Sequence, residues 1–201
     1  KLMFDEGTHS LWSTLEGRPV VGPLVGQGIE LKRRNVVTTT WGGWRSRHPD
    51  TQVLSLETGH RRDYSEGAAY RDYFATDRLM FPVPFHDQRL AHKAAGGGLR
   101  MGENEQAVAL SVAALRKRPV FLGQFEEYQF LALTDTIGTH RVFELKTAFH
   151  VDRWNGIDTI IEENGTRWAL KEDGLVADDG RRLPRLTTHR AFWFGWYAAF
   201  P

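Results

Sequence analysis

The sequence predicts a mainly β, α+β fold of two pseudo-repeats, each made of β-hairpins or small sheets and closed by a short tryptophan-bearing helix. The first observation behind this prediction is an internal duplication, because residues 28–49 align with residues 180–201 at an offset of 152. Tryptophan is scarce and bulky, so two tryptophans in register favour a repeat over coincidence. The matched pairs are Gly28/Gly180, Leu31/Leu183, Arg33/Arg185, Trp41/Trp193, Gly43/Gly195, Trp44/Trp196 and Pro49/Pro201.

The second observation is a set of hairpin signals. FDEGTHSLW (4–12) resembles IEENGTRW (161–168), so the same hairpin is expected in both repeats. In the second copy the Asn164-Gly165 pair lies between apolar runs, which is a strong turn signal. Before it, EYQFLALTD (127–135) and THRVFELK (139–146) are predicted strands.

The first repeat is predicted to span residues 1–49 and to end in a helix within TTTWGGWRSRHP (38–49). Thr39 or Thr40 can cap this helix, because a threonine hydroxyl accepts a hydrogen bond from a free amide of the first turn. The proline at its end stops it.

A polar connector rich in tyrosine and arginine is predicted over residues 50–97, and the second repeat over residues 98–201. Within this part we expect a hinge in the Gly-rich stretch AAGGGLRMG (94–102), a helix from Glu105 to Leu115 and a final helix capped by Thr188. The tryptophans of the two closing helices lie three residues apart and so share a face. All four are predicted to be structural anchors of the core: Trp41, Trp44, Trp193 and Trp196.

The first repeat starts almost at its hairpin, whereas a long segment precedes the matching hairpin of the second. We therefore expect the first repeat to be N-terminally incomplete. A segment equivalent to residues 98–159, or a protein partner, is expected to cover residues 1–12, since an unpaired hairpin leaves open strand edges.

Composition excludes several classes. Lys plus Arg (26) nearly balance Asp plus Glu (25), so nucleic acid is not an expected partner. No apolar run reaches the roughly 20 residues that span a bilayer, and membrane association would come through a partner or an upstream segment. The chain has no cysteine, which removes thiol nucleophiles and disulfides from these residues.

The densest polar chemistry lies in the connector. Two interpretations stay open for its charged and tyrosine side chains: a structural network that ties the repeats together, or an inter-repeat pocket for an anionic ligand, since arginine forks and tyrosine hydroxyls suit carboxylate or phosphate groups. The residues are Arg62, Asp63, Tyr64, Asp87 and Arg89.

The eight histidines raise the alternative of a metal ion. None shows the spacing of a known metal motif, so a site would have to be assembled from distant segments. The first candidates are His48, His60 and His189. No residue is assigned a catalytic role, and no other cofactor is evident.

Taken in order, FDEGTHSLWS, GPLVG, TTTWGGWRSRHP, VLSLETGHRRDY, LMFPVPFHDQRL and HRAFWFGWYAAF resemble the domain of unknown function 3179 (DUF3179) family over nearly the whole chain. The resemblance implies a prokaryotic, extracytoplasmic (periplasmic or cell-surface) protein without a settled activity. It also implies, for many relatives, a Cys-x-x-Cys-type or selenocysteine pair upstream of the first hairpin.

Three functional hypotheses follow. The first is a non-catalytic binding or accessory subunit of a larger assembly, for which membrane association is one option. The second is the scaffold of a thiol or selenol redox protein whose active thiols lie upstream of residue 1, since a lowered thiol pKa produces a reactive thiolate. The third is a metal- or anion-binding protein that uses the cleft between the repeats.

Overall fold

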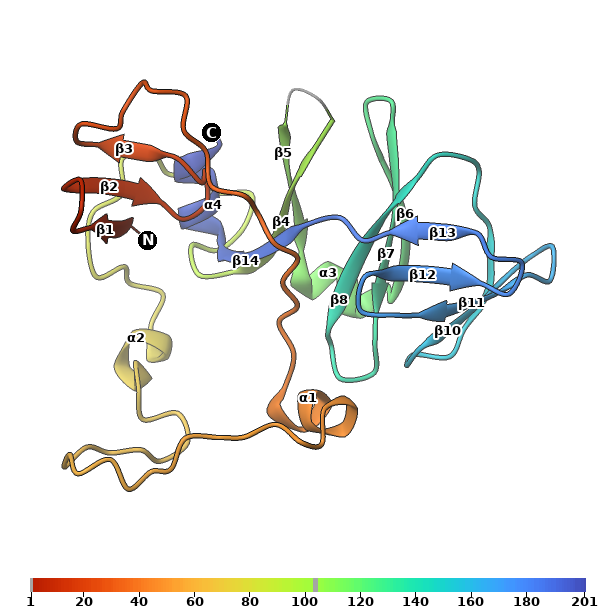
Figure 1. Cartoon of the computed structure of the whole chain (residues 1–201), viewed down its shortest axis with the longest axis horizontal. Helices are drawn as coiled ribbons and strands as arrows, with labels where there is room; N and C mark the ends of the chain where they lie inside the picture. The colour runs from red at the N-terminus through yellow and green to blue at the C-terminus, as the bar shows by residue number, and fades with distance from the viewer. Residues whose placement is uncertain (1, 103–104) are drawn as a thin grey trace.

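The structure, a computed structural model, describes residues 2–102 and 105–201. Within these ranges the chain forms four antiparallel sheets and four short helices (Figure 1). The β-rich α+β class predicted from the sequence is thereby confirmed. Lys1, the first residue of the predicted covered segment, lies outside the described residues.

The first repeat contains a small sheet and one helix. Strands β1 (Leu2–Asp5), β2 (Ser10–Ser13) and β3 (Pro19–Val21) pair in the order β1-β2-β3, which confirms the predicted hairpin. Helix α1 (Trp41–Arg47) begins after Thr40, whose Oγ1 accepts a hydrogen bond from the amide of Gly43 at 3.1 Å. Of the two predicted caps, Thr40 is therefore the one used.

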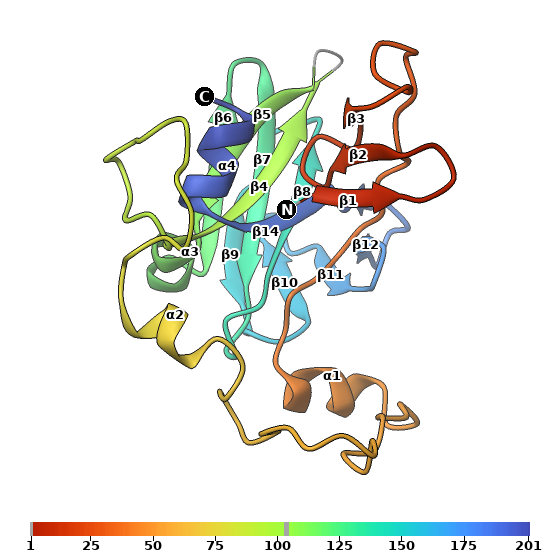
Figure 2. The ribbon, with the colours of Figure 1, turned by 90° about the vertical axis from the view of Figure 1, so that its left-hand side faces the viewer.

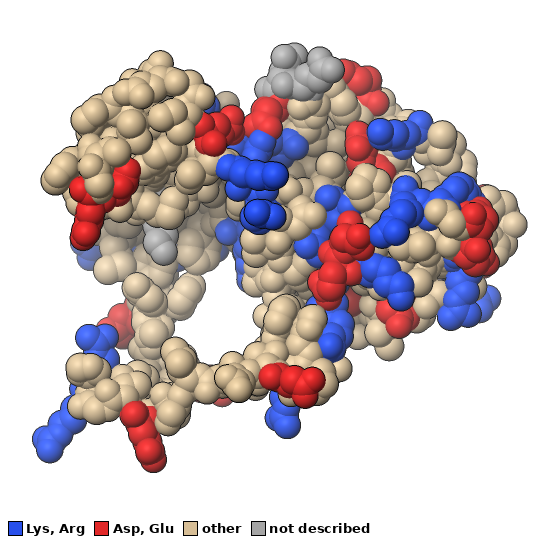
Figure 3. All heavy atoms as spheres, viewed as in Figure 1, with Lys and Arg blue, Asp and Glu red and all other residues tan. Residues whose placement is uncertain are grey.

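The connector contains one short helix, α2 (Arg71–Ala75), between irregular segments. It runs away from the rest of the molecule and leaves an opening beside the first repeat, as the space-filling view shows (Figure 3). Its apolar side chains are exposed, including Leu54 at 94% and Met80 at 71%.

The second repeat starts with a sheet of order β14-β4-β5, formed by β4 (Ala95–Met101), β5 (Gln106–Ser111) and β14 (Thr188–Phe192). Two predictions were wrong here. The Gly-rich stretch is the central strand of this sheet rather than a hinge. The helix predicted from Glu105 is a strand up to Ser111 and becomes helix α3 only at Val112–Lys117, because ladder pairing with β4 outweighs the weak helical pattern.

Two further sheets form the main core. Strands β6 (Val120–Phe125), β7 (Tyr128–Thr134) and β8 (His140–Leu145) make one of them, which confirms the two predicted strands. The other has the order β13-β12-β11-β10-β9. Its strands are β9 (Val151–Trp154), β10 (Thr159–Glu162), β11 (Arg167–Leu170), β12 (Gly174–Ala177) and β13 (Arg182–Pro184).

The predicted turn between β10 and β11 is also confirmed. Gly165 adopts φ 86°, a left-handed conformation that glycine tolerates without steric cost. The face of the five-stranded sheet packs on β7 and β8, and buried leucine, phenylalanine and tryptophan side chains fill the space between them. The centre of this core is formed by Leu131, Phe143, Ile160, Trp168 and Leu175.

Helix α4 (Trp193–Ala199) closes the second repeat, with Trp193 and Trp196 on its buried face as predicted. The predicted cap was wrong. Thr188 begins strand β14, and the residue before the helix is Phe192, whose side chain makes no capping hydrogen bond. Residues 188–192 pair with β4 along their whole length, so the helix starts later than a threonine cap would place it.

The duplication is visible in the structure. Helices α1 and α4 begin and end at the same offset as the aligned sequences, and each has a ring pair at its C-terminal end: Trp44 with His48, and Trp196 with Phe200. Where the extended segments before these helices cross, the equivalent residues Asn35 and Thr187 share a 2.7 Å hydrogen bond. This contact joins the two repeats at equivalent positions.

The prediction that all four tryptophans are core anchors was wrong for the first repeat. Trp193 and Trp196 are 7% and 4% exposed, but Trp41 and Trp44 are 51% and 39% exposed. The sequence pattern is the same in both helices, so the difference lies in what each helix packs against.

Helix α4 depends on a glycine in β4. A Cβ added at Gly98 would overlap the Trp196 ring. We expect Gly98→Ala to lower the free energy of unfolding by about 1–3 kcal/mol through overpacking. The control is Gly42→Ala in α1, where no atom lies within 4 Å of the added methyl group and no loss is expected. Denaturant unfolding measures both, and equal effects would contradict the proposed Gly98–Trp196 packing.

Candidate functional site

The edge of the first sheet is open at strand β1. In the second repeat the equivalent strand is β10, because Trp12 pairs with Met3 as Trp168 pairs with Ile160. Strand β10 lies between β11 and β9, whereas β1 pairs with β2 alone among the described strands. A strand that exposes its amides and carbonyls in this way is a template for pairing with another chain.

The side chains of β1 are apolar and exposed. Leu2, Met3 and Phe4 are 55%, 41% and 58% exposed, while Ile160, the equivalent of Met3, is 0% exposed. Ile160 is covered by β7 and β8 in the main core. The first repeat therefore presents the kind of surface that the second repeat buries inside its own fold.

A second open segment precedes helix α1. Residues 36–40 align with β14, which pairs with β4 from Thr188↔Leu99 to Phe192↔Ala95. Residues 36–40 have no sheet partner among the described residues. A side-chain hydrogen bond joins this segment to the second repeat, from Thr139 Oγ1 to Thr39 Oγ1 at 2.9 Å.

The tryptophans of α1 form the third open surface. Trp44 stacks on His48 with ring centroids 3.9 Å apart and donates its indole N–H to Thr51 at 2.8 Å. Trp196, its equivalent, lies instead over Gly98 of β4. Trp44 therefore has a ring partner at the end of its helix, as Trp196 does. Unlike Trp196, it does not lie over a glycine of a β-strand among the described residues.

These three surfaces border one opening. In Figure 1 the first sheet lies above it, residues 32–40 run along one side, α1 lies below and the connector closes the far side. In the second repeat the corresponding space, between α4 and the five-stranded sheet, is filled by β4–β8 and α3. Figure 2 shows the first sheet and α1 separated by the same extended segment, and in Figure 3 the lobe of β1–β3 is largely free of charged side chains.

A comparison with protein families matches the whole chain, residues 1–201, to the family described as "Protein of unknown function (DUF3179)". The chain belongs to the DUF3179 family. Neither the curated proteins nor the solved structures contain a match. No described helix of this DUF3179 protein has the length and apolar character needed to cross a bilayer.

The connector residues predicted to form a pocket divide into two groups. Asp87 pairs with Arg89, accepts the indole N–H of Trp193 at 3.0 Å, and so joins the connector to α4. The Arg89 guanidinium lies 5.0 Å from the centroid of the same indole. These hydrogen bonds, chiefly the one from Arg89, lower the pKa of Asp87.

The other group stays within the connector. Asp63 accepts hydrogen bonds from Ser65, and the Tyr64 hydroxyl lies 2.8 Å from that of Thr58. Arg62 is exposed. The five predicted side chains do not share one set of contacts. Of them, Asp87 and Arg89 contact Trp193 of α4.

The histidines proposed as metal ligands lie on three different elements. His48 ends α1, His60 lies in the exposed connector, and His189 is on β14. In the described part of the chain, no three His, Asp or Glu side chains are grouped as a metal site. Burial, as the main cause, lowers the pKa of His189.

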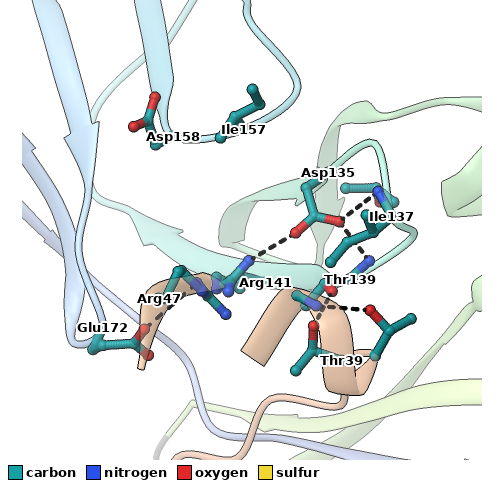
Figure 4. A network of polar contacts seen from close by, with 12 residues as sticks. Thr39, Arg47, Asp135, Ile137, Thr139, Arg141, Ile157, Asp158 and Glu172 are labelled. Carbon is teal, nitrogen blue, oxygen red and sulfur yellow. Dashed lines mark hydrogen bonds and ion pairs between the residues drawn. The ribbon is translucent and has the colours of Figure 1, made fainter. Parts of the chain in front are cut away.

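Sequence reasoning missed a cluster of arginines at the contact between α1 and the second repeat (Figure 4). Arg141 is 2% exposed, with Nη1 3.5 Å from Asp135, and Arg47 of α1 lies 3.5 Å from Glu172. The missed signal was Arg141 itself, because a charged residue inside the apolar run of a predicted strand is unusual.

Proposed function

We propose that this DUF3179 protein is a non-catalytic binding module, an accessory subunit whose first repeat is completed by a β-rich polypeptide partner. The observation that carries the proposal is the difference in burial between equivalent residues of the two repeats. Met3 and Trp44 are exposed where Ile160 and Trp196 are buried. The family resemblance supports a place outside the cytoplasm for this assembly.

The second repeat indicates the chemistry of the partner. Strand β9 pairs with β10, so the partner is expected to add a strand to the open edge of β1. Strands β7 and β8 cover Ile160 with leucine and phenylalanine, so an apolar sheet face is expected over Met3. Gly98 of β4 lies under the Trp196 ring, so a glycine-bearing strand is expected under Trp44.

The energetics favour occupation of this surface. The apolar side chains of β1, α1 and the connector are exposed, and burying such area contributes roughly 25 cal/mol per Å². Exposed tryptophans are strong anchors in interfaces because they bury a large area at low entropic cost.

Photo-crosslinking in the native host tests the proposal. A photoreactive phenylalanine analogue is placed at Met3 and, separately, at Trp44, and the crosslinked peptides are sequenced by mass spectrometry. We expect both positions to capture one and the same polypeptide, through an apolar strand at Met3 and a glycine-bearing strand at Trp44. Ile157, 64% exposed on the second repeat, is the control position and is expected to give neither peptide.

Each result has a defined meaning. Absence of crosslinks at both positions, or capture of unrelated polypeptides at the two, would refute the proposal. The sequence of the captured peptide also tells whether it belongs to a separate protein or to the same polypeptide as the module.

A further inference from the structure

Two buried arginines of the second repeat lack hydrogen-bond partners. The side chains of Arg141 and Arg185 are 2% and 8% exposed. Nε and Nη2 of Arg141, and Nε and Nη1 of Arg185, are covered by protein atoms and have no partner among the described residues. Each unmet buried donor costs on the order of 1–3 kcal/mol, so four such donors call for a ligand.

The two side chains come from neighbouring backbone segments. Arg185 forms an isolated antiparallel bridge with Phe143, two positions after Arg141 on β8. Helix α1 adds Arg47 and His48, whose Nε2 is also buried without a hydrogen bond. The site therefore lies between the first and second repeats, where α1 covers the end of β8 (Figure 4).

The carboxylates present do not satisfy these donors. Glu172 lies 3.5 Å from Arg47, 3.7 Å from His48 and 4.0 Å from Arg185, distances too long for good hydrogen bonds, and its side chain is 56% exposed. Asp135 reaches only Nη1 of Arg141, at 3.5 Å. Asp173 also lies close enough to Arg185 to act on its charge, but no hydrogen bond joins the two side chains. The carboxylates nearby therefore leave the Nε and Nη atoms named above without partners.

The same chain shows how such an arginine pair is satisfied. Arg33 is the first-repeat equivalent of Arg185, and it forms an ion pair with Glu105. The other oxygen of the Glu105 carboxylate lies 2.8 Å from Nη1 of the buried Arg100. One carboxylate therefore bridges Arg33 and Arg100. Among the described residues, no carboxylate bridges Arg141 and Arg185 in this way.

We infer that Arg141 and Arg185 bind a small free oxyanion, with a carboxylate or phosphate group bridging the two guanidinium groups as Glu105 bridges Arg33 and Arg100. Guanidinium forks match the paired oxygens of such groups. Because the donor atoms are covered by protein, the ligand is small and enters beside the half-exposed Glu172. Burial lowers the pKa of both arginines, but a guanidinium keeps its charge in proteins.

Thermal unfolding of the purified chain in inorganic phosphate, in acetate and in sodium chloride of equal ionic strength tests this inference. We expect the melting temperature to rise with phosphate or acetate concentration and to saturate, since a ligand that binds only the folded state stabilises it. The arm with the larger rise identifies the class of oxyanion. Equal melting in all three solutions would overturn the inference and leave water as the partner of these donors.

Two variants locate the site. Arg141→Met is expected to abolish the oxyanion-dependent shift. Glu172→Gln is expected to strengthen phosphate binding about tenfold in titration calorimetry, because it removes a competing negative charge close to the ligand. Glu172 is half-exposed, so this variant keeps the fold even where Arg141→Met does not. Unchanged or weaker phosphate binding in Glu172→Gln would place the anion elsewhere.

Discussion

Trp196→Ala is expected to lower the free energy of unfolding by about 3–5 kcal/mol, the usual range for truncating a buried tryptophan. The Trp196 side chain is 4% exposed, lies over Gly98 of β4 and has its ring centroid 4.6 Å from that of Phe200. Removing the indole leaves a cavity that the rigid sheet beneath it cannot fill. Denaturant unfolding of the isolated chain measures this loss.

Trp44→Ala is the matched control, because the duplication places Trp44 at the equivalent position of α1. Trp44 is 39% exposed, so we expect a loss of about 0.5–1 kcal/mol in the isolated chain. In the complex with the proposed partner the same substitution is expected to weaken binding strongly. Equal losses for both variants in the isolated chain would mean that α1 is already packed and would remove one support of the proposed function.

The sequence could predict that each repeat has a hairpin and a closing helix, because both elements depend on local signals. The Trp-x-x-Trp spacing, the Asn164-Gly165 turn and the proline stops act within a few residues, and the structure has a helix or hairpin at each of these places. The expected segment over residues 1–12 followed from the same duplication. It remains a prediction that the crosslinking experiment tests.

The exposure of Trp41 and Trp44 could not be predicted in this way, because the burial of a side chain depends on the surface that its helix packs against. The same is true of the Gly-rich stretch, which looks like a hinge in isolation but becomes a central strand when β14 and β5 pair with it. The arginine cluster was missed for a related reason. Arg141 and Arg185 are distant in sequence and become neighbours only through the bridge between β8 and the segment after β13.

Ile160→Ala is expected to lower the free energy of unfolding by about 2–5 kcal/mol, as for other fully buried aliphatic residues. Ile160 is 0% exposed and lies on β10 between its neighbours β9 and β11, against Leu131 and Phe143 of the facing sheet. The truncation therefore leaves a cavity between two hydrogen-bonded sheets. Because both sheets are rigid, neither can shift to fill this cavity.

Met3→Ala is the control for Ile160→Ala. It removes a side chain with the same number of heavy atoms at the equivalent register position of β1, where Met3 is 41% exposed. We expect a loss below about 1 kcal/mol in the isolated chain. A loss of the same size as for Ile160→Ala would show that the first sheet buries Met3 in solution, so that the β1 surface is closed and unable to receive a strand. The expected result is a small loss of unfolding free energy for Met3→Ala and a large one for Ile160→Ala. It would mean that the equivalent hairpin position is buried because a second sheet packs on it, and not because of the hairpin sequence.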